Sequence, residues 1–179
     1  MAGSRFARCA TLAIAVAGLF SGGALEATAQ DGRLIGECQT WCALTTDTPK
    51  VCWIAAQPTV PAVLPAGRFR DPTVFTVRID AADGNKKVPG VDMGYPLAGP
   101  VTITIDGGEP FTMVTFTPDE SGEKAWLRTD EEDARLLVAM LRGRSMVVAG
   151  RSTGGTNTSD TYSLVGVTAA LERATRECQ

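Results

Sequence analysis

Short runs of alternating apolar and polar residues dominate the sequence from residue 51 onward. In residues 73–80, Phe75, Val77 and Ile79 share one face of an extended strand, because successive side chains of a strand point to opposite faces. Similar runs, separated by turn residues such as Asp83-Gly84-Asn85, predict a mainly antiparallel β structure. The predicted strands are residues 51–56, 73–80, 101–105, 111–117, 123–128, 145–150 and 160–167.

Two segments show helical spacing of their apolar residues. Thr129 followed by Glu132 forms a capping box, and the acidic run 130–133 lies where the helix dipole favours negative charge. Apolar residues then recur at helical spacing as far as Arg142-Gly143, which supply a basic last turn and a stop. A shorter alanine-rich helix is predicted at residues 168–176. The pattern therefore predicts an all-β fold, an antiparallel β-sandwich with one inserted α-helix and a short C-terminal helix.

The N-terminal residues have the pattern of a secretory signal peptide. Arg5 and Arg8 precede a twelve-residue apolar run at residues 9–20, and Ala27-Thr28-Ala29 offers the small residues that signal peptidase recognises. The run is too short for a helix that stays across a bilayer. We therefore expect export to the periplasm, the outer envelope or the medium, with no membrane span after cleavage. The predicted division is residues 1–29 as signal peptide, residues 30–50 as a loose cysteine-bearing segment, and residues 51–179 as the β-sandwich domain.

Composition removes several classes of function. The chain contains no histidine, so a Ser-His-Asp triad, a Cys-His dyad and a histidine-ligated zinc are excluded. The formal net charge is −3, and loss of residues 1–29 changes it to about −4, because two arginines and one glutamate leave. No basic face is then expected to neutralise phosphates, so nucleic acid is not the expected partner. Neither a cofactor nor a metal site is predicted.

Four cysteines follow the predicted signal peptide, and they are Cys38, Cys42, Cys52 and Cys178. An even number of cysteines in an exported chain predicts disulfide bonds. The spacing differs from the paired knuckles of a structural zinc site, and the C-x3-C pair lacks the features of a thioredoxin-type redox motif. Four cysteines allow three pairings, which the spacing alone leaves open. Labelling of free thiols at Cys38 and Cys42 would test a redox role.

Two short motifs are the basis of an alternative hypothesis, that the protein is an enzyme. Residues 150–154 match the G-x-S-x-G serine motif, but the chain has no histidine to accept the serine proton. Ser121 and Lys124 match S-x-x-K without the companion motifs of penicillin-binding enzymes. The alternative is thus a small periplasmic hydrolase or wall-modifying enzyme that uses carboxylates or a Ser/Lys pair. A cleft that gathered Asp119, Glu120, Glu123 and Lys124 would support it.

Residues 151–160 are predicted to be an exposed connection between two strands. They are rich in hydroxyl-bearing residues and glycine and include no large apolar side chain, so they are not expected to contribute to a core. Such a segment can present hydrogen-bonding groups to a partner. The candidate binding residues are Arg151, Ser152, Thr153, Asn157 and Thr158.

Several longer motifs occur along the chain in a characteristic order. The first is Cys52-Trp53-Ile54-Ala55-Ala56-Gln57-Pro58, followed by Gly94-Tyr95-Pro96, the strand 101–107, Ala125-Trp126 and the helical residues 137–140. The most specific is Gly155-Thr156-x-Thr158-x-Asp160-Thr161-Tyr162-Ser163-Leu164, which continues to Leu171. With these motifs, the stretch from Trp41 to Cys178 resembles the invasion-associated locus B family of exported bacterial proteins.

The resemblance implies an immunoglobulin-like β-sandwich in the periplasm or outer envelope, linked to host-cell invasion in some relatives, and it transfers no catalytic residue. Cys52 lies in the first shared strand and Cys178 beyond the last shared motif, so we expect these two to be bonded. Cys38 and Cys42 precede the first shared motif, which begins at Cys52, and are expected to bond to each other. We therefore expect a non-enzymatic envelope protein that acts by binding or structural support, with an unknown envelope or host-surface component as its partner.

Overall fold

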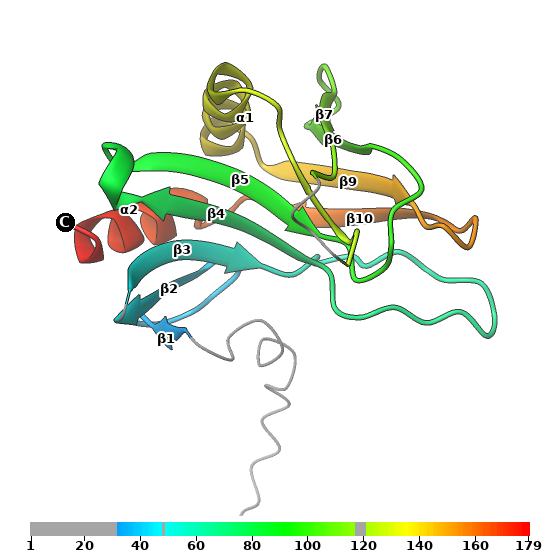
Figure 1. The fold of residues 1–179 in the computed structure, drawn as a ribbon, viewed down its shortest axis with the longest axis horizontal. Coiled ribbons are helices and arrows are strands. Elements are labelled where there is room, and N and C mark those ends of the chain that lie inside the picture. Colours follow the sequence, from blue (N-terminus) through cyan, green and yellow to red (C-terminus); the bar gives the residue numbers. More distant parts are fainter. Residues whose placement is uncertain (1–31, 48, 117–120) are drawn as a thin grey trace, which may run out of the picture.

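The computed structural model describes residues 32–47, 49–116 and 121–179, so the predicted signal peptide lies outside the described residues. Within these ranges the chain forms ten strands, two α-helices and one short 3-10 helix, η1 (Figure 1). None of the helices in the same ranges is long and apolar enough to cross a membrane. In chain order the elements are β1 (Arg33–Leu34), β2 (Cys42–Asp47), β3 (Lys50–Ala56), β4 (Val74–Asp80), η1 (Ala81–Asp83), β5 (Lys86–Asp92), β6 (Val101–Ile105), β7 (Phe111–Met113), β8 (Lys124–Trp126), α1 (Asp130–Arg142), β9 (Ser145–Arg151), β10 (Asn157–Ser163) and α2 (Val167–Glu177).

The strands form two antiparallel sheets. The larger sheet has six strands in the order β1-β2-β3-β4-β5-β8, and the smaller has four in the order β10-β9-β6-β7. An isolated bridge between Val114 and Trp126 joins the two sheets along one side, because Val114 continues β7 and Trp126 ends β8. The fold is thus mostly β, with two antiparallel sheets and two helices, as the alternating pattern predicted. The immunoglobulin-like strand order that the resemblance implied is not shown by this topology.

Strand β4 follows its predicted alternation, whereas β5 was not predicted. Phe75, Val77 and Ile79 are fully buried on β4, while the residues between them point outward. Strand β5 contains Pro89 next to a glycine, and proline in a run normally argues against a paired strand. In the sheet Pro89 lies opposite Val77, and the residues beside Pro89 on β5 keep that strand paired in register with β4. The hairpin between β4 and β5 still uses the predicted turn.

The segment before residue 51 is not loose, so that expectation was wrong. Strand β2 lies between β1 and β3 in the larger sheet, and its first four residues are buried. Ala43 contributes to the main core, while Leu44 packs on the outer face of the sheet against Trp53 and Val74. Both faces of β2 are therefore covered. A strand covered on both faces shows no polar–apolar alternation, which is why the pattern did not reveal it.

The core lies between the larger sheet and a second layer that consists of the smaller sheet and α2. Figure 1 shows α2 and the smaller sheet on the same side of the larger sheet, with α2 at the end of the molecule where the C-terminus is marked. Three aromatic residues cross this core: Trp41 meets Phe75 edge-on at 6.3 Å between ring centroids, and Phe75 meets Tyr162 at 6.1 Å. The Trp41 indole Nε1 also donates to the backbone oxygen of Ser163 at 2.8 Å. These contacts connect the two layers.

Helix α1 begins as predicted and ends for a different reason. The Thr129 hydroxyl accepts from the Glu132 backbone N–H at 3.2 Å, and the Glu132 carboxylate accepts from the Arg128 backbone N–H at 3.0 Å. At the other end Gly143 has extended backbone, with φ −82° and ψ 171°, rather than the left-handed conformation of a glycine stop. A Cβ at this position would lie 2.4 Å from Cγ2 of Ile105. Gly143 is therefore required by close packing rather than by its backbone angles.

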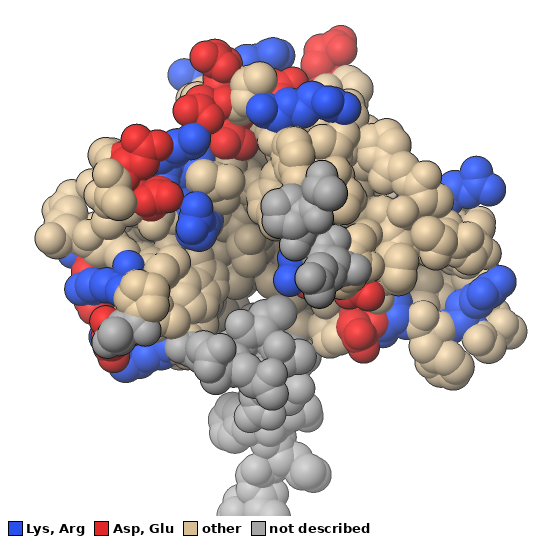
Figure 2. All heavy atoms as spheres, viewed as in Figure 1, with Lys and Arg blue, Asp and Glu red and all other residues tan. Residues whose placement is uncertain are grey.

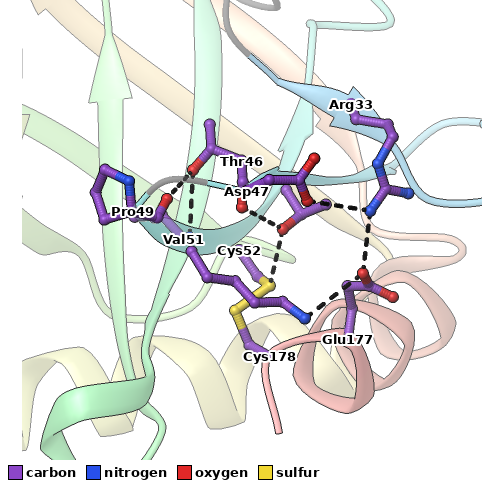
Figure 3. Close-up of polar contacts among 10 residues, drawn as sticks. Arg33, Thr46, Asp47, Pro49, Val51, Cys52, Glu177 and Cys178 are labelled. Atoms are coloured by element: carbon purple, nitrogen blue, oxygen red, sulfur yellow. Dashed lines mark hydrogen bonds and ion pairs between the residues drawn. A yellow bond between two sulfur atoms is a disulfide. The ribbon is translucent and has the colours of Figure 1, made fainter.

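Two disulfide bonds restrain the chain. Cys52 of β3 is bonded to Cys178 after α2, with 6.0 Å between the Cα atoms, and Cys38 is bonded to Cys42, with 4.6 Å between them. These are the two pairs that the sequence analysis chose. Figure 3 shows the first bond beside Glu177, whose carboxylate lies 3.2 Å from the Arg33 guanidinium. This ion pair is partly exposed, so the covalent bond is the stronger restraint on α2.

We expect the substitution Cys178→Ser to lower the melting temperature far more than the replacement of Cys38 and Cys42 together. The bond from Cys52 closes a loop with a sequence separation of 126, and the other closes one of 4. In the chain-entropy model these bonds restrain the unfolded chain by about 5 and about 2 kcal/mol. Thermal unfolding of the variants measures the difference, and peptide mapping of the non-reduced protein checks the pairing. A peptide that links Cys42 to Cys52 would contradict it.

Candidate functional site

Three loops meet at the end of the molecule opposite the labelled C-terminus, and we call this surface the loop end (Figure 1). The longest is residues 57–73, which joins β3 to β4. The second, residues 94–100, follows β5. The third is the tip of the β9–β10 hairpin, which consists of residues 152–156 and the flanking strand residues Arg151 and Asn157. All three connect strands of the core, so the two sheets determine where they lie.

Backbone hydrogen bonds hold the hairpin tip against the second loop. Thr153 donates its N–H to the Pro96 oxygen at 2.9 Å, and Ala98 donates to the Arg151 oxygen at 2.8 Å. The long loop is attached by a bridge in which Val60 and Thr161 exchange backbone bonds at 3.0 and 2.8 Å. The three loops therefore form one connected surface.

Gly94 allows the long loop to approach the second loop closely. Its φ is +67°, and a Cβ there would lie 2.1 Å from the backbone oxygen of Asp71. The Asp71 N–H donates to the Gly94 oxygen at 3.0 Å. Any larger residue at 94 would be strained by its backbone angle and would displace Asp71. This is the physical role of the glycine in the Gly94-Tyr95-Pro96 motif.

A buried ion pair fixes the long loop to β10. The Arg70 guanidinium makes two hydrogen bonds to the Asp160 carboxylate, one of them 2.7 Å from Nη1 to Oδ2. Asp160 is fully buried and the Arg70 side chain is only 9% exposed. The Ala62 backbone N–H donates to the same carboxylate at 2.8 Å. Hydrogen bonding to Asp160 raises the pKa of Arg70, so the guanidinium stays charged.

Two further polar side chains are buried beside this pair. The Thr158 hydroxyl lies 2.6 Å from the Tyr95 hydroxyl, and both residues are less than a tenth exposed. Burial raises the pKa of Tyr95 and of Tyr162. The Tyr162 hydroxyl has no hydrogen-bond partner among the described residues. Thr158, Asp160 and Tyr162 alternate along β10, so one face of this strand carries polar groups into the interior.

The predicted exposed loop 151–160 is therefore wrong for half of its length. Strand β9 extends to Arg151 and β10 begins at Asn157, which leaves only residues 152–156 between them. Ser152 is half-buried, and its hydroxyl accepts from the Thr156 N–H at 3.1 Å. Of the five candidate binding residues, the exposed ones are Arg151, Thr153 and Asn157, whereas Thr158 is buried.

The structure exposes apolar side chains that the sequence analysis did not select. Val63 is 96% exposed and Phe69 is 92% exposed, and Val60 is 61% exposed. All three lie on the long loop. Their signal in the sequence is large apolar residues inside a proline-rich stretch that is neither strand nor helix. Single exposed apolar residues are common, but three on one loop mark a candidate interaction surface.

Basic side chains accompany these apolar residues. Arg68 and Arg151 are exposed, and no ion pair is found for either among the described residues. Arg68 donates to the backbone oxygen of Gly154 at 3.5 Å. Asp71 is the one acidic residue of the three loops. In the view of Figure 2 the right-hand tip of the molecule carries blue and tan atoms and no red ones.

Of the residues of the enzyme alternative, the structure describes Ser121, Glu123 and Lys124. Asp119 and Glu120 lie outside the described residues. Lys124 lies on the larger sheet, where its ammonium is 3.9 Å from the Asp92 carboxylate. Ser121 accepts a hydrogen bond from the Glu123 N–H at 3.2 Å, as in an ordinary turn. Among the described residues there is also no group of three or more side chains suited to hold a metal ion.

One carboxylate with a raised pKa lies elsewhere, on α1. Asp133 is 7% exposed, and its Oδ1 has no hydrogen-bond partner among the described residues. Burial raises its pKa to about 6, against the opposing charge of Lys86 and with the help of Asp130 and Glu132. The helix dipole thus does not stabilise all four acidic residues of the first turn, because burial opposes the ionised form of Asp133. Asp130, in contrast, forms an ion pair with Lys86 at 2.6 Å.

We expect Asp133→Asn to stabilise the protein at neutral pH. A raised pKa means that ionised Asp133 destabilises the folded state, and this penalty develops as the pH rises from about 4 to about 6. Above that range the variant should exceed the wild type in stability, and near pH 4 the two should coincide. Urea unfolding across this pH range measures the effect. Equal stability at every pH would show that Asp133 is not buried in solution.

We expect Thr158→Ala to destabilise the protein by about 1–3 kcal/mol, because the Tyr95 hydroxyl loses its buried partner. Thr153→Ala is the matched control, since Thr153 is exposed on the same hairpin and should change stability by less than about 0.5 kcal/mol. Chemical denaturation of both variants gives the two values. Equal small losses would restore the prediction of an exposed loop at residue 158.

Comparison with known proteins extends the description to the fold as a whole. No family model matches the chain, and no curated protein matches its sequence. The crystal structure of invasion associated protein B from Bartonella henselae is similar, with a TM-score of 0.57 and 16% sequence identity. The match covers 81% of this chain and 98% of that chain. At this identity the likeness concerns the fold, and it agrees with the resemblance found in the motifs. The chain therefore has the fold of invasion associated protein B.

Proposed function

We propose that the protein is a non-enzymatic exported protein that binds a component of the envelope or of a host surface through the loop end. The observation that carries this proposal is the near-complete exposure of Val63 and Phe69 on a loop fixed by the buried Arg70–Asp160 pair. Water opposes the exposure of such side chains, which favours a partner that covers them.

The attachment of the loop supports binding rather than accidental exposure. Pro58, Pro61 and Pro65 restrict the backbone of the loop, and the bridge at Val60 and the ion pair at Arg70 fasten it on both sides of its apolar residues. A loop held in this way loses little conformational entropy when a partner binds. The same fastening prevents Val63 and Phe69 from folding back onto the core.

Two observations support export. Disulfide bonds persist mainly in oxidising compartments outside the cytoplasm, and the chain has two. Residues 1–29 have the pattern of a signal peptide. We infer a location in the periplasm or outer envelope, or secretion. Because the protein of similar fold is called invasion associated, we include host surfaces among the candidate partners.

Binding to isolated envelopes of the producing bacterium tests the proposal. We expect the exported form, beginning near Gln30, to cosediment with these envelopes, and we expect the double variant Val63→Ser with Phe69→Ser to bind at least tenfold more weakly, because each side chain would lose its apolar contact. Val165→Ser is the matched control, since Val165 is 69% exposed but lies after β10, beyond the opposite end of that strand.

Thermal unfolding should show that all these variants fold as well as the wild type, because the replaced side chains are exposed. Unchanged binding of the double variant would place the partner on another surface. An equal loss for Val165→Ser would mean that any exposed apolar side chain contributes non-specifically.

A further inference from the structure

We propose that the partner of the loop end is an anionic lipid surface, into which Phe69 and Val63 insert while Arg68 and Arg151 contact lipid phosphates. The proposal rests on the proposed function and uses the same surface. The protein would then be a peripheral membrane protein.

The shape of the surface favours a bilayer over a protein pocket. Val63 and Phe69 project from the loop at 96% and 92% exposure, so almost none of either side chain rests on neighbouring residues. Figure 1 shows the long loop and the tip of the β9–β10 hairpin extending side by side beyond the sheets. Projecting side chains need either a matching cavity or a partner that deforms to surround them. A fluid interface of headgroups and acyl chains does so without a matching cavity.

The charges favour an anionic surface. The three loops contain Arg68, Arg70 and Arg151 against one acidic residue, Asp71, and Arg70 is already paired with the buried Asp160. The whole chain carries a net charge of −3, whereas Arg68 and Arg151 outnumber the single carboxylate of the three loops. An anionic membrane attracts a surface with such a local excess of positive charge. The protein would therefore approach with Phe69 and Val63 in front.

The two kinds of residue have separable roles. Each arginine near an anionic surface strengthens binding by about fivefold, an effect that salt weakens. The apolar side chains contribute about tenfold or more each when they leave water, and salt does not screen this part. Neither contribution requires the loop to fold on binding, because its backbone bonds at Val60 and the Arg70–Asp160 pair are already formed.

Cosedimentation with defined vesicles tests the proposal. One set contains phosphatidylcholine alone, and the other an equimolar mixture with phosphatidylglycerol. We expect the exported form to bind the mixed vesicles and to bind phosphatidylcholine far less. Val63→Ser with Phe69→Ser should lose about a hundredfold in affinity for the mixed vesicles, because each side chain contributes about tenfold. Arg68→Gln with Arg151→Gln should lose about twenty-five-fold, because each arginine contributes about fivefold, and should remove most of the salt dependence.

Insertion is measured directly with Phe69→Trp. Acyl chains that carry bromine quench a tryptophan only when its ring lies within the bilayer, so the added emission should be quenched on mixed vesicles. Val165→Trp serves as control for a tryptophan on another surface, and Arg142→Gln serves as control for the loss of one exposed charge. Both controls should keep the affinity of the wild type, and Val165→Trp should remain unquenched.

Several results would overturn the lipid partner. Binding that inorganic phosphate abolishes at constant ionic strength, without quenching of Phe69→Trp, would show an anion site and no insertion. Envelope binding that requires Phe69 but disappears after protease treatment of the envelopes, with no binding to vesicles, would identify a protein partner; the proposed function would then stand and this inference would fail. If the exported form bound neither vesicles nor envelopes, both the lipid partner and the proposed function would be wrong.

Discussion

The buried hydrogen-bonded pair of Arg70 and Asp160 is the interaction on which the loop end depends. It ties the long loop to β10 at a point where water is excluded, and the Ala62 N–H occupies a further position on the same carboxylate. Removal of one partner would leave an isolated charge in the interior, which costs about 3–5 kcal/mol. Such a pair adds little stability over apolar packing, but it admits only one position of the loop. Its contribution is therefore the placement of Val63 and Phe69 rather than the stability of the fold.

The molecule is fastened at its two ends by different chemistry. Near α2 the restraint is covalent, through Cys52 and Cys178, and exposed ion pairs add little to it. At the loop end the restraint is a group of buried polar contacts. Between them the core is apolar, crossed by the aromatic contacts of Trp41, Phe75 and Tyr162. The end closed by the disulfide is thus held covalently, and the end that presents apolar side chains is held by hydrogen bonds and an ion pair.

Sequence patterns predicted the strands and helices that have one face against the core and the other in water. The alternation of β4 and the capping box of α1 are of this kind, because local spacing alone determines them. Prediction failed where tertiary contacts change the meaning of a residue. Pro89 lies within a paired strand, β2 is covered on both faces, and Thr158 and Asp160 carry polar groups inward to partners 63 and 90 residues away. The motif that begins at Gly155 contains Thr158 and Asp160, but only the structure shows that they hold Tyr95 and Arg70 at the loop end. Phe69 and Val63 were missed because exposure cannot be deduced from residue type.

The sequence separations of the two disulfides bear on the order in which they would form during export. In a chain exported with its N-terminus first, Cys52 would reach the oxidising compartment well before Cys178, which follows it by 126 residues. During that interval the thiols of Cys38 and Cys42 are the near neighbours with which Cys52 could mispair. Closure of a ring with a sequence separation of only 4 is fast, because the ends of short loops meet often. Once Cys38 and Cys42 are joined, Cys52 has no competing thiol in the exported segment and waits as a free thiol for Cys178. Early formation of the local bond would therefore leave Cys178 as the remaining thiol partner of Cys52.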